Sequence, residues 1–221
     1  MVPSSHHLSR RRSGLRATLT LTAGALALTA CFTGQRPSFE DEQPLNEPTG
    51  SAEIDEVLER LDSVGVEPFS ADYEILTKLG SIESTATVVQ ADDGRRSITV
   101  NDIRFLINTG TDSTCDLVAD TCEAVINDAR ISDTQLTHDF YAGSFAQRLR
   151  VDANRRVGDP RGYQITQAGQ QATCVDVPVT GGSKSYCALD SGQLARYDGA
   201  DQFIEMVAIG PDVDEAAFEP S

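Results

Sequence analysis

The hydrophobic pattern of the chain is helical at first and alternates afterwards. Between residues 52 and 64, apolar residues recur three and four positions apart, and acidic residues occupy most of the positions between them. This pattern predicts one amphipathic helix that ends near Gly65, just before Pro68. Its apolar face consists of Ile54, Val57, Leu58, Leu61 and Val64.

After the helix the period changes to two, which predicts half-buried antiparallel strands. A helical region interrupts them at 132–156, where Gly143 bends or splits the helix. Asp92-Asp93-Gly94 predicts a tight turn between the second and third strands. The strands are expected around 71–75, 85–88, 97–101, 104–108, 162–166, 171–179, 184–189, 193–197 and 202–209.

An uncharged apolar run, residues 17–30, follows four arginines between positions 10 and 16. As a helix this run would span roughly 21 Å, which is less than the hydrocarbon core of about 30 Å. Short length, a basic start and small residues at the end are typical of an export signal. We therefore predict a signal peptide over residues 1–30.

The end of that run, Leu28-Thr29-Ala30-Cys31, resembles a bacterial lipobox. The resemblance implies that Cys31 receives a diacylglyceryl group and begins the mature chain, whose acyl chains anchor it to the extracytoplasmic face of the cell membrane. The alternative is a secretory signal with an unrelated cysteine near its cleavage site. Ser9-Arg10-Arg11 leaves a twin-arginine export route open beside the general one.

The net charge limits which partners the protein can bind. Without residues 1–30 the chain keeps 14 basic and 34 acidic residues, a net charge of −20. Such a surface repels nucleic acid and anionic headgroups, so membrane contact must come from the acyl chains. Residues 31–50 are acidic and proline-rich, which predicts a solvated tether, and residues 211–221 form an acidic tail that we expect to be loose.

Four cysteines remain in the predicted mature domain, and an exported chain is expected to oxidise them. Cys174 and Cys187 flank a glycine-containing turn, and Cys115 and Cys122 flank a short acidic segment. We therefore prefer two local disulfides, Cys115–Cys122 and Cys174–Cys187, among the three pairings that four cysteines allow. A zinc site or redox pair is the alternative, but the spacing is unlike that of a zinc site, and the mature chain has one histidine, His138.

The order of helix, strands, helical insertion and strands over residues 51–210 resembles the LolA/LolB-like superfamily, including LppX/LprG-type envelope lipoproteins. Phe69-Ser70-Ala71-Asp72-Tyr73 matches the family's sF-x-A-x-[FY] pattern, and residues 192–197 match its G-x-L-x-x-[YF] hairpin. The resemblance implies an α+β fold, a strongly curved antiparallel sheet (an incomplete β-barrel) with helices packed on its concave face. A long sheet with one apolar face must curl around something, and the two helices are the available filler.

Members of that family hold acyl chains in the cavity that such a sheet encloses. Alternation alone cannot distinguish a lined cavity from a filled core, because both need one apolar face. Both interpretations therefore stay open for the residues that would line the cavity. These are Tyr73, Ile75, Val88, Ile98, Val100, Phe105, Leu136 and Phe140.

The sequence contains no recognisable catalytic or cofactor motif. There is no G-x-S-x-G, phosphate-binding glycine loop or H-E-x-x-H, and the acidic clusters do not fit a calcium loop. His138-Asp139 invites a catalytic interpretation, but a sole histidine on a predicted helix is more often a surface residue. We expect a protein that is not an enzyme and has no metal and no cofactor.

These observations favour a tethered lipoprotein of the cell envelope that binds an apolar ligand, a lipid or an acyl chain, in a half-barrel cavity. The anchor at Cys31 and the two disulfides depart from the soluble carriers of the family and disfavour a shuttle. The alternative is a protein-binding or envelope-stress sensory module on the same scaffold, whose acidic face contacts a basic envelope protein.

Overall fold

The computed structural model describes residues 47–65 and 67–220. The predicted signal peptide, Cys31 and the tether up to residue 46 lie outside the described residues. Residues Leu45–Ser221 form one compact unit. In the part of the chain that is described, no helix has both the length and the apolar character needed to cross a membrane.

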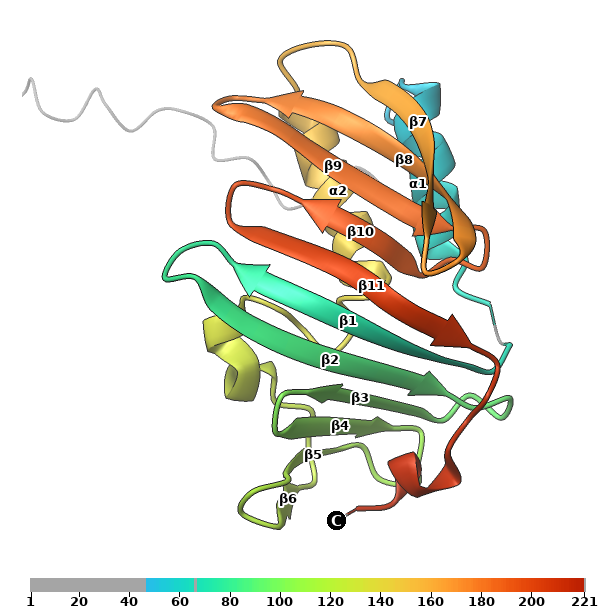
Figure 1. Ribbon diagram of the computed structural model, residues 1–221, viewed down its shortest axis with the longest axis vertical. Coiled ribbons are helices and arrows are strands. Elements are labelled where there is room, and N and C mark those ends of the chain that lie inside the picture. Colours follow the sequence, from blue (N-terminus) through green and yellow to red (C-terminus); the bar gives the residue numbers. More distant parts are fainter. Residues whose placement is uncertain (1–46, 66, 221) are drawn as a thin grey trace, which may run out of the picture. The chain divides into compact units, whose positions relative to one another are not determined.

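One antiparallel sheet of eleven strands dominates the unit, and it does not close into a barrel (Figure 1). Strands β1–β6 form one meander and β7–β11 another, and the pairing of β1 with β11 joins the two halves. The edges are β6 and β7. The strands are β1 (Phe69–Thr77), β2 (Ile82–Gln90), β3 (Arg96–Val100), β4 (Ile103–Ile107), β5 (Ser113–Asp116), β6 (Thr121–Glu123), β7 (Arg161–Gln167), β8 (Gln170–Val179), β9 (Gly182–Leu189), β10 (Leu194–Asp198) and β11 (Gln202–Gly210).

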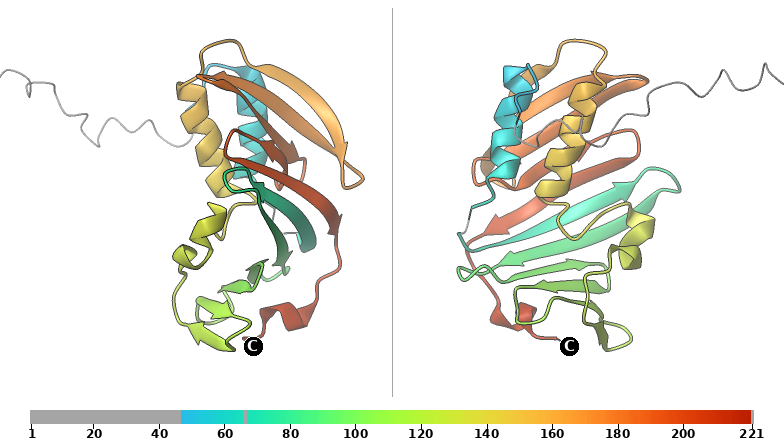
Figure 2. Two further views of the ribbon diagram at one scale, coloured as in Figure 1. Left: turned by 60° about the vertical axis from the view of Figure 1, so that its left-hand side comes forward. Right: turned by 180° about the vertical axis from the view of Figure 1, so that it is seen from behind.

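Two helices cover the concave face over the β7–β11 half of the sheet, α1 (Ala52–Asp62) and α2 (Gly143–Asn154) (Figure 2). The Ser51 side chain caps α1 by accepting the Ile54 N–H at 3.4 Å. The end of α1 rests on the turn between β9 and β10, where a Cβ at Gly192 would lie 2.7 Å from the Val64 Cα. Only glycine therefore permits this approach. The predicted curved α+β fold is confirmed.

The second predicted helix is wrong in its first half. Residues Asp128–Thr134 form a 3₁₀ helix, and α2 begins only at Gly143, which starts the helix instead of bending it. Gln135 has a φ of 56°, and the Thr134 hydroxyl donates to the Ile131 carbonyl. Side chains that bond to nearby backbone compete with helical hydrogen bonds, which explains the irregular path here.

The C-terminal residues are packed rather than loose. A second 3₁₀ helix, Glu215–Phe218, places Phe218 against Val89 and Ala91 in a small apolar cluster separate from the main core. The Arg95 guanidinium lies 4.6 Å from the centre of the Phe218 ring and forms an ion pair with Glu215 at 3.0 Å. The acidic segment is therefore fastened to the β2–β3 hairpin.

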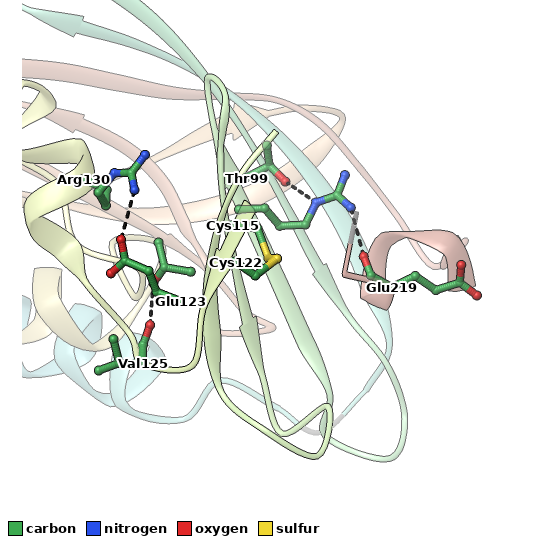
Figure 3. Close-up of a disulfide and its surroundings, with 9 residues drawn as sticks. Thr99, Cys115, Cys122, Glu123, Val125, Arg130 and Glu219 are labelled. Atoms are coloured by element: carbon green, nitrogen blue, oxygen red, sulfur yellow. Dashed lines mark hydrogen bonds and ion pairs between the residues drawn. A yellow bond between two sulfur atoms is a disulfide. The ribbon is translucent and has the colours of Figure 1, made fainter. Parts of the chain in front are cut away.

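Both expected disulfides are present. Cys115 lies directly opposite Cys122 on β5 and β6, and Cys174 lies directly opposite Cys187 on β8 and β9. Figure 3 shows the first bridge beside Glu123 and Arg130. Two bridges of this kind are typical of an extracytoplasmic, oxidising compartment.

Candidate ligand cleft on the concave face

The eight residues proposed as cavity lining come together on the concave face. They project from β1, β2, β3 and β4 and from the segment that precedes α2, and they belong to one apolar cluster in which each is at most 5 % exposed. The Tyr73 and Phe140 rings, for example, meet edge to face with centres 5.1 Å apart. Ile75 and Val100 also border surface pockets of about 400 and 320 Å³.

Residues 124–142, the covering segment, cross the concave face of the β1–β5 half of the sheet (Figure 2). Its side chains Ile131, Leu136 and Phe140 are buried in the main core. Near its start, Arg130 forms an ion pair with Asp116 at 2.5 Å. It forms a second one with Glu123 at 3.2 Å, which Figure 3 shows. The segment therefore fills the space in front of these strands and is fastened to the β5–β6 hairpin.

His138 lies within the covering segment and serves it structurally. Its backbone N–H donates to Asp128 at 2.6 Å, and its Nδ1 lies 3.1 Å from both oxygens of the same carboxylate. Within the described ranges, no three His, Cys, Asp or Glu residues are grouped so that they could hold a metal ion. These contacts hold His138 against Asp128 and so close a loop within the covering segment.

A cleft of about 400 Å³ lies between the two helices and the sheet, and we call it the helix cleft. The end of α1, the start of α2 and the β2–β3 region all contribute to it. Leu61, Tyr141 and Ala142 belong both to its wall and to the main apolar core, so the cleft ends on the core itself. Its lining is Leu61, Asp62, Val64, Gly65, Gln90, Gly94, Arg96, Asn108, Asp139, Tyr141, Ala142 and Gly143.

Arg96 is the basic side chain of the helix cleft. It is partly buried and donates to the Tyr141 hydroxyl at 3.3 Å, and no carboxylate of the described residues forms an ion pair with it. The two acids of the cleft are already engaged, since Asp62 pairs with Arg150 and Asp139 accepts from the Thr137 hydroxyl at 2.6 Å. The guanidinium therefore has hydrogen-bonding capacity left for an anionic or polar group.

Tyr141 lines the helix cleft, and Tyr73 is a buried tyrosine of the same core that interacts with it electrostatically. Burial raises the pKa of Tyr141 above its ordinary value, and the neighbouring Arg96 opposes that shift. Burial also raises the pKa of Tyr73 well above its ordinary value, and nearby Tyr141 adds to the shift. Among the described residues the Tyr73 hydroxyl has no hydrogen-bond partner, which leaves one unsatisfied polar atom in this part of the core.

Three further pockets of about 320–400 Å³ are less suited to an anionic group. One lies against Phe69 and Ile209 with Glu67 and Asp190 in its wall, and a second includes Glu74 and Glu83; neither has a basic residue in its lining. The third contains Arg130, whose charge is already paired twice. The helix cleft differs because it combines an apolar floor with an arginine that has no acidic partner within residues 47–65 and 67–220.

Sequence reasoning missed Arg96, although a signal for it exists. Arg96 alternates with Ile98 and Val100 on β3, so it is a charged residue on the apolar face of a strand. A lone charge in such a position is costly unless it reaches the rim of the core or meets a partner. Tyr141, by contrast, fits the apolar period of the helix predicted at 132–156, which indicates a core residue, and its hydroxyl role depends on the irregular path of the covering segment.

Comparison with known proteins gives distant likenesses only. No family model matches the chain, and no curated protein matches it. Among solved structures, MucB is 12 % identical and has a TM-score of 0.44, covering 78 % of this chain and 64 % of its own. The Pseudomonas aeruginosa MucA/MucB complex is 16 % identical with a TM-score of 0.42, covering 77 % and 62 %.

An outer membrane lipoprotein-sorting protein domain from Vibrio parahaemolyticus is 9 % identical, with a TM-score of 0.33, and covers 74 % of this chain and 94 % of that domain. This chain thus spans less than two thirds of the MucB structures and nearly all of the sorting domain.

Proposed function

We propose that this chain is a non-enzymatic lipoprotein of the cell envelope that binds a lipid-like amphiphile in the helix cleft. The observation that carries the proposal is the cleft's composition, an apolar floor continuous with the core beside an arginine that forms no ion pair with any acid in the described part of the chain. Pockets of 300–1,000 Å³ with apolar walls and a few polar groups are the usual form of a small-molecule site. The acyl chain occupies the floor, and Arg96 binds the carboxylate or phosphate of the head.

The covering segment limits how much of an acyl chain the closed form admits. Leu136 and Phe140 occupy the concave face, where a longer chain would continue. A long chain therefore enters as these two side chains withdraw, and a short chain binds without that movement. The proposal includes the membrane anchor at Cys31, which would keep the domain at the membrane surface where such ligands are found.

Binding of a fluorescent fatty acid to residues 45–221 tests this function. Replacing Arg96 by Gln should weaken binding of the anionic probe at least tenfold, because a hydrogen bond to a charged group contributes about 1.5–3 kcal/mol. Binding of a neutral long-chain alcohol should be nearly unchanged. Arg155→Gln is the matched control, since Arg155 is exposed and lies outside the cleft.

Equal loss of both probes, or equal effects of the two arginine variants, would show that Arg96 does not bind the head. No binding of either probe to the wild-type protein would end the ligand proposal. Membrane release of a Cys31→Ala variant of the full chain, measured by fractionation, tests the anchor separately.

A second candidate function is capture of a basic envelope protein, favoured by the net charge of −20 on the predicted mature chain. In that case binding should weaken steeply with added salt, and Arg96→Gln should leave it unchanged. The two candidates therefore respond differently to the same variant.

A further inference from the structure

Strand β7 is an open edge of the sheet. It pairs with β8 on one side, its seven residues are all at least partly exposed, and it contains neither proline nor an acidic residue. The opposite edge, β6, has only three residues and is bridged to β5 by a disulfide. Short, capped edges are protected against pairing with other chains, whereas β7 lacks that protection.

The disulfide between β8 and β9 fixes which backbone groups of β7 face outward. Cys174 and Cys187 lie opposite each other with their Cα atoms 4.0 Å apart, which is the spacing of a non-hydrogen-bonded pair. The N–H and C=O of Cys174 therefore point toward β7, where they meet Tyr163. By alternation, the backbone groups of Gly162, Gln164 and Thr166 point away from the sheet.

These outward groups have no partner among the described residues. Apart from the ladder with β8, no hydrogen bond of the described chain involves a backbone N–H or C=O of Gly162, Gln164 or Thr166. Three donors and three acceptors thus stand in a row at strand spacing, ready to pair with another extended chain.

We propose that β7 pairs with β7 of a second copy of this chain, antiparallel, about a two-fold axis at Gln164. In this register Gln164 faces its own copy and Gly162 faces Thr166, so every outward group meets an outward group. The three pairs exchange about six backbone hydrogen bonds, two in each hydrogen-bonded pair. Any other antiparallel register with a two-fold axis leaves some of the outward backbone N–H and C=O groups of β7 unpaired.

The side chains of β7 agree with this register. Tyr163 meets Ile165 of the second copy, and pairs of an aromatic with a β-branched residue stabilise antiparallel strands. Arg161 meets Gln167, so no like charges oppose each other.

Charge favours β7 over other surfaces of the domain as the contact between copies. The predicted mature chain has a net charge of −20, so most of its surface repels a second copy. β7 contributes one positive and no negative charge, so a contact along this strand meets less of that repulsion than the rest of the surface, with Glu53 of α1 the acid that lies against it at Gly162.

Cross-linking of the full chain expressed in a bacterial envelope tests the two-fold contact. A Gln164→Cys variant should form an intermolecular disulfide on a non-reducing gel, because residues opposite each other on paired strands lie within the Cα distance that a disulfide spans. Thr111→Cys is the control, an exposed position that precedes β5. Equal cross-linking of the two variants, or a Gln164→Cys adduct with the mass of another protein, would overturn the proposal.

Charged substitutions of Gln164, the residue on the proposed two-fold axis, supply a second test that does not depend on a new thiol. Gln164→Lys and Gln164→Glu each place like charges opposite each other, so each alone should raise the dimer dissociation constant at least tenfold in sedimentation of the detergent-purified full chain. A mixture of the two variants should dimerise as well as wild type. Gln164 is exposed, so both variants should unfold at the wild-type urea concentration; dimers of wild-type strength in either variant alone would refute the contact.

Discussion

Asp152 fastens α2 to the sheet, and its replacement by alanine should be strongly destabilising. Asp152 is 4 % exposed, and each of its carboxylate oxygens lies 2.8 Å from Lys184 Nζ. The Tyr186 hydroxyl also donates to it, and both partners are on β9. Because α2 forms one wall of the helix cleft, this network also positions the cleft.

The size of the effect follows from what the substitution leaves behind. Without Asp152, the Lys184 ammonium stays mostly buried without its partner, and the fully buried Tyr186 hydroxyl loses its acceptor. Removing one partner of a buried ion pair costs about 3–5 kcal/mol. The Lys184 side chain is 20 % exposed, so water offsets part of this cost and we expect about 3 kcal/mol. For a domain of this size the midpoint of thermal unfolding should fall by roughly 6–12 °C.

Urea unfolding followed by circular dichroism measures the free energies of Asp152→Ala, Lys184→Met and the double variant. The double variant should lose less free energy of unfolding than the sum of the two single losses, by about 1–2 kcal/mol. The reason is that each single change leaves a buried polar group without its partner. Asp159→Ala, which removes an exposed acid just beyond α2, is the control and should lie within about 0.5 kcal/mol of wild type. Additive losses, or a small effect of Asp152→Ala, would refute the reasoning.

Two other predictions concern stability. Replacing Cys174 and Cys187 by alanine should cost about 3 kcal/mol or more in urea unfolding, and opening the bridge between β5 and β6 about 2.4 kcal/mol, since their sequence separations are 13 and 7. Burial acts to raise the pKa of Asp201, but Arg148 outweighs it and holds the pKa below the ordinary 3.8. The stabilisation that this ion pair gives the folded state is present above about pH 4 and is lost as the pH falls through the folded pKa of Asp201. The loss of stability caused by Arg148→Met should therefore shrink toward pH 2, as measured by acid unfolding.

The predictable parts of this fold are those in which one local pattern determines the outcome. The apolar stripe from Ile54 to Leu61 is buried as a helix, and Ser51 caps it where the pattern begins. The alternation from Ala71 to Ile75 is buried on one face of β1, and the glycine at 94 closes the β2–β3 turn with a φ of 85°. Such elements need only hydrophobic periodicity and turn chemistry.

The covering segment could not be predicted in the same way. Its apolar residues at 136, 140 and 141 fit a helical period, yet the chain there is irregular. What decides the backbone is the surface that those side chains must reach, and much of that surface is made by residues distant in sequence, since Tyr73 on β1 packs against Phe140 and Phe69 packs against Tyr141. Apolar side chains spaced at the helical period of 3.6 residues are therefore buried here by a segment that is not a helix.

The same dependence on distant contacts explains why the candidate site differs from the one expected. The alternating strands supply the apolar concave wall, which holds six of the eight predicted residues, while Leu136 and Phe140 on the covering segment complete the core instead of bordering an empty space. The helix cleft is the gap left where the covering segment meets α2 and α1 ends, at turns that interrupt the continuous apolar face. Arg96 lies on β3 at this gap, so the apolar wall and the charge that could orient a ligand meet at the rim of the core and not at its centre.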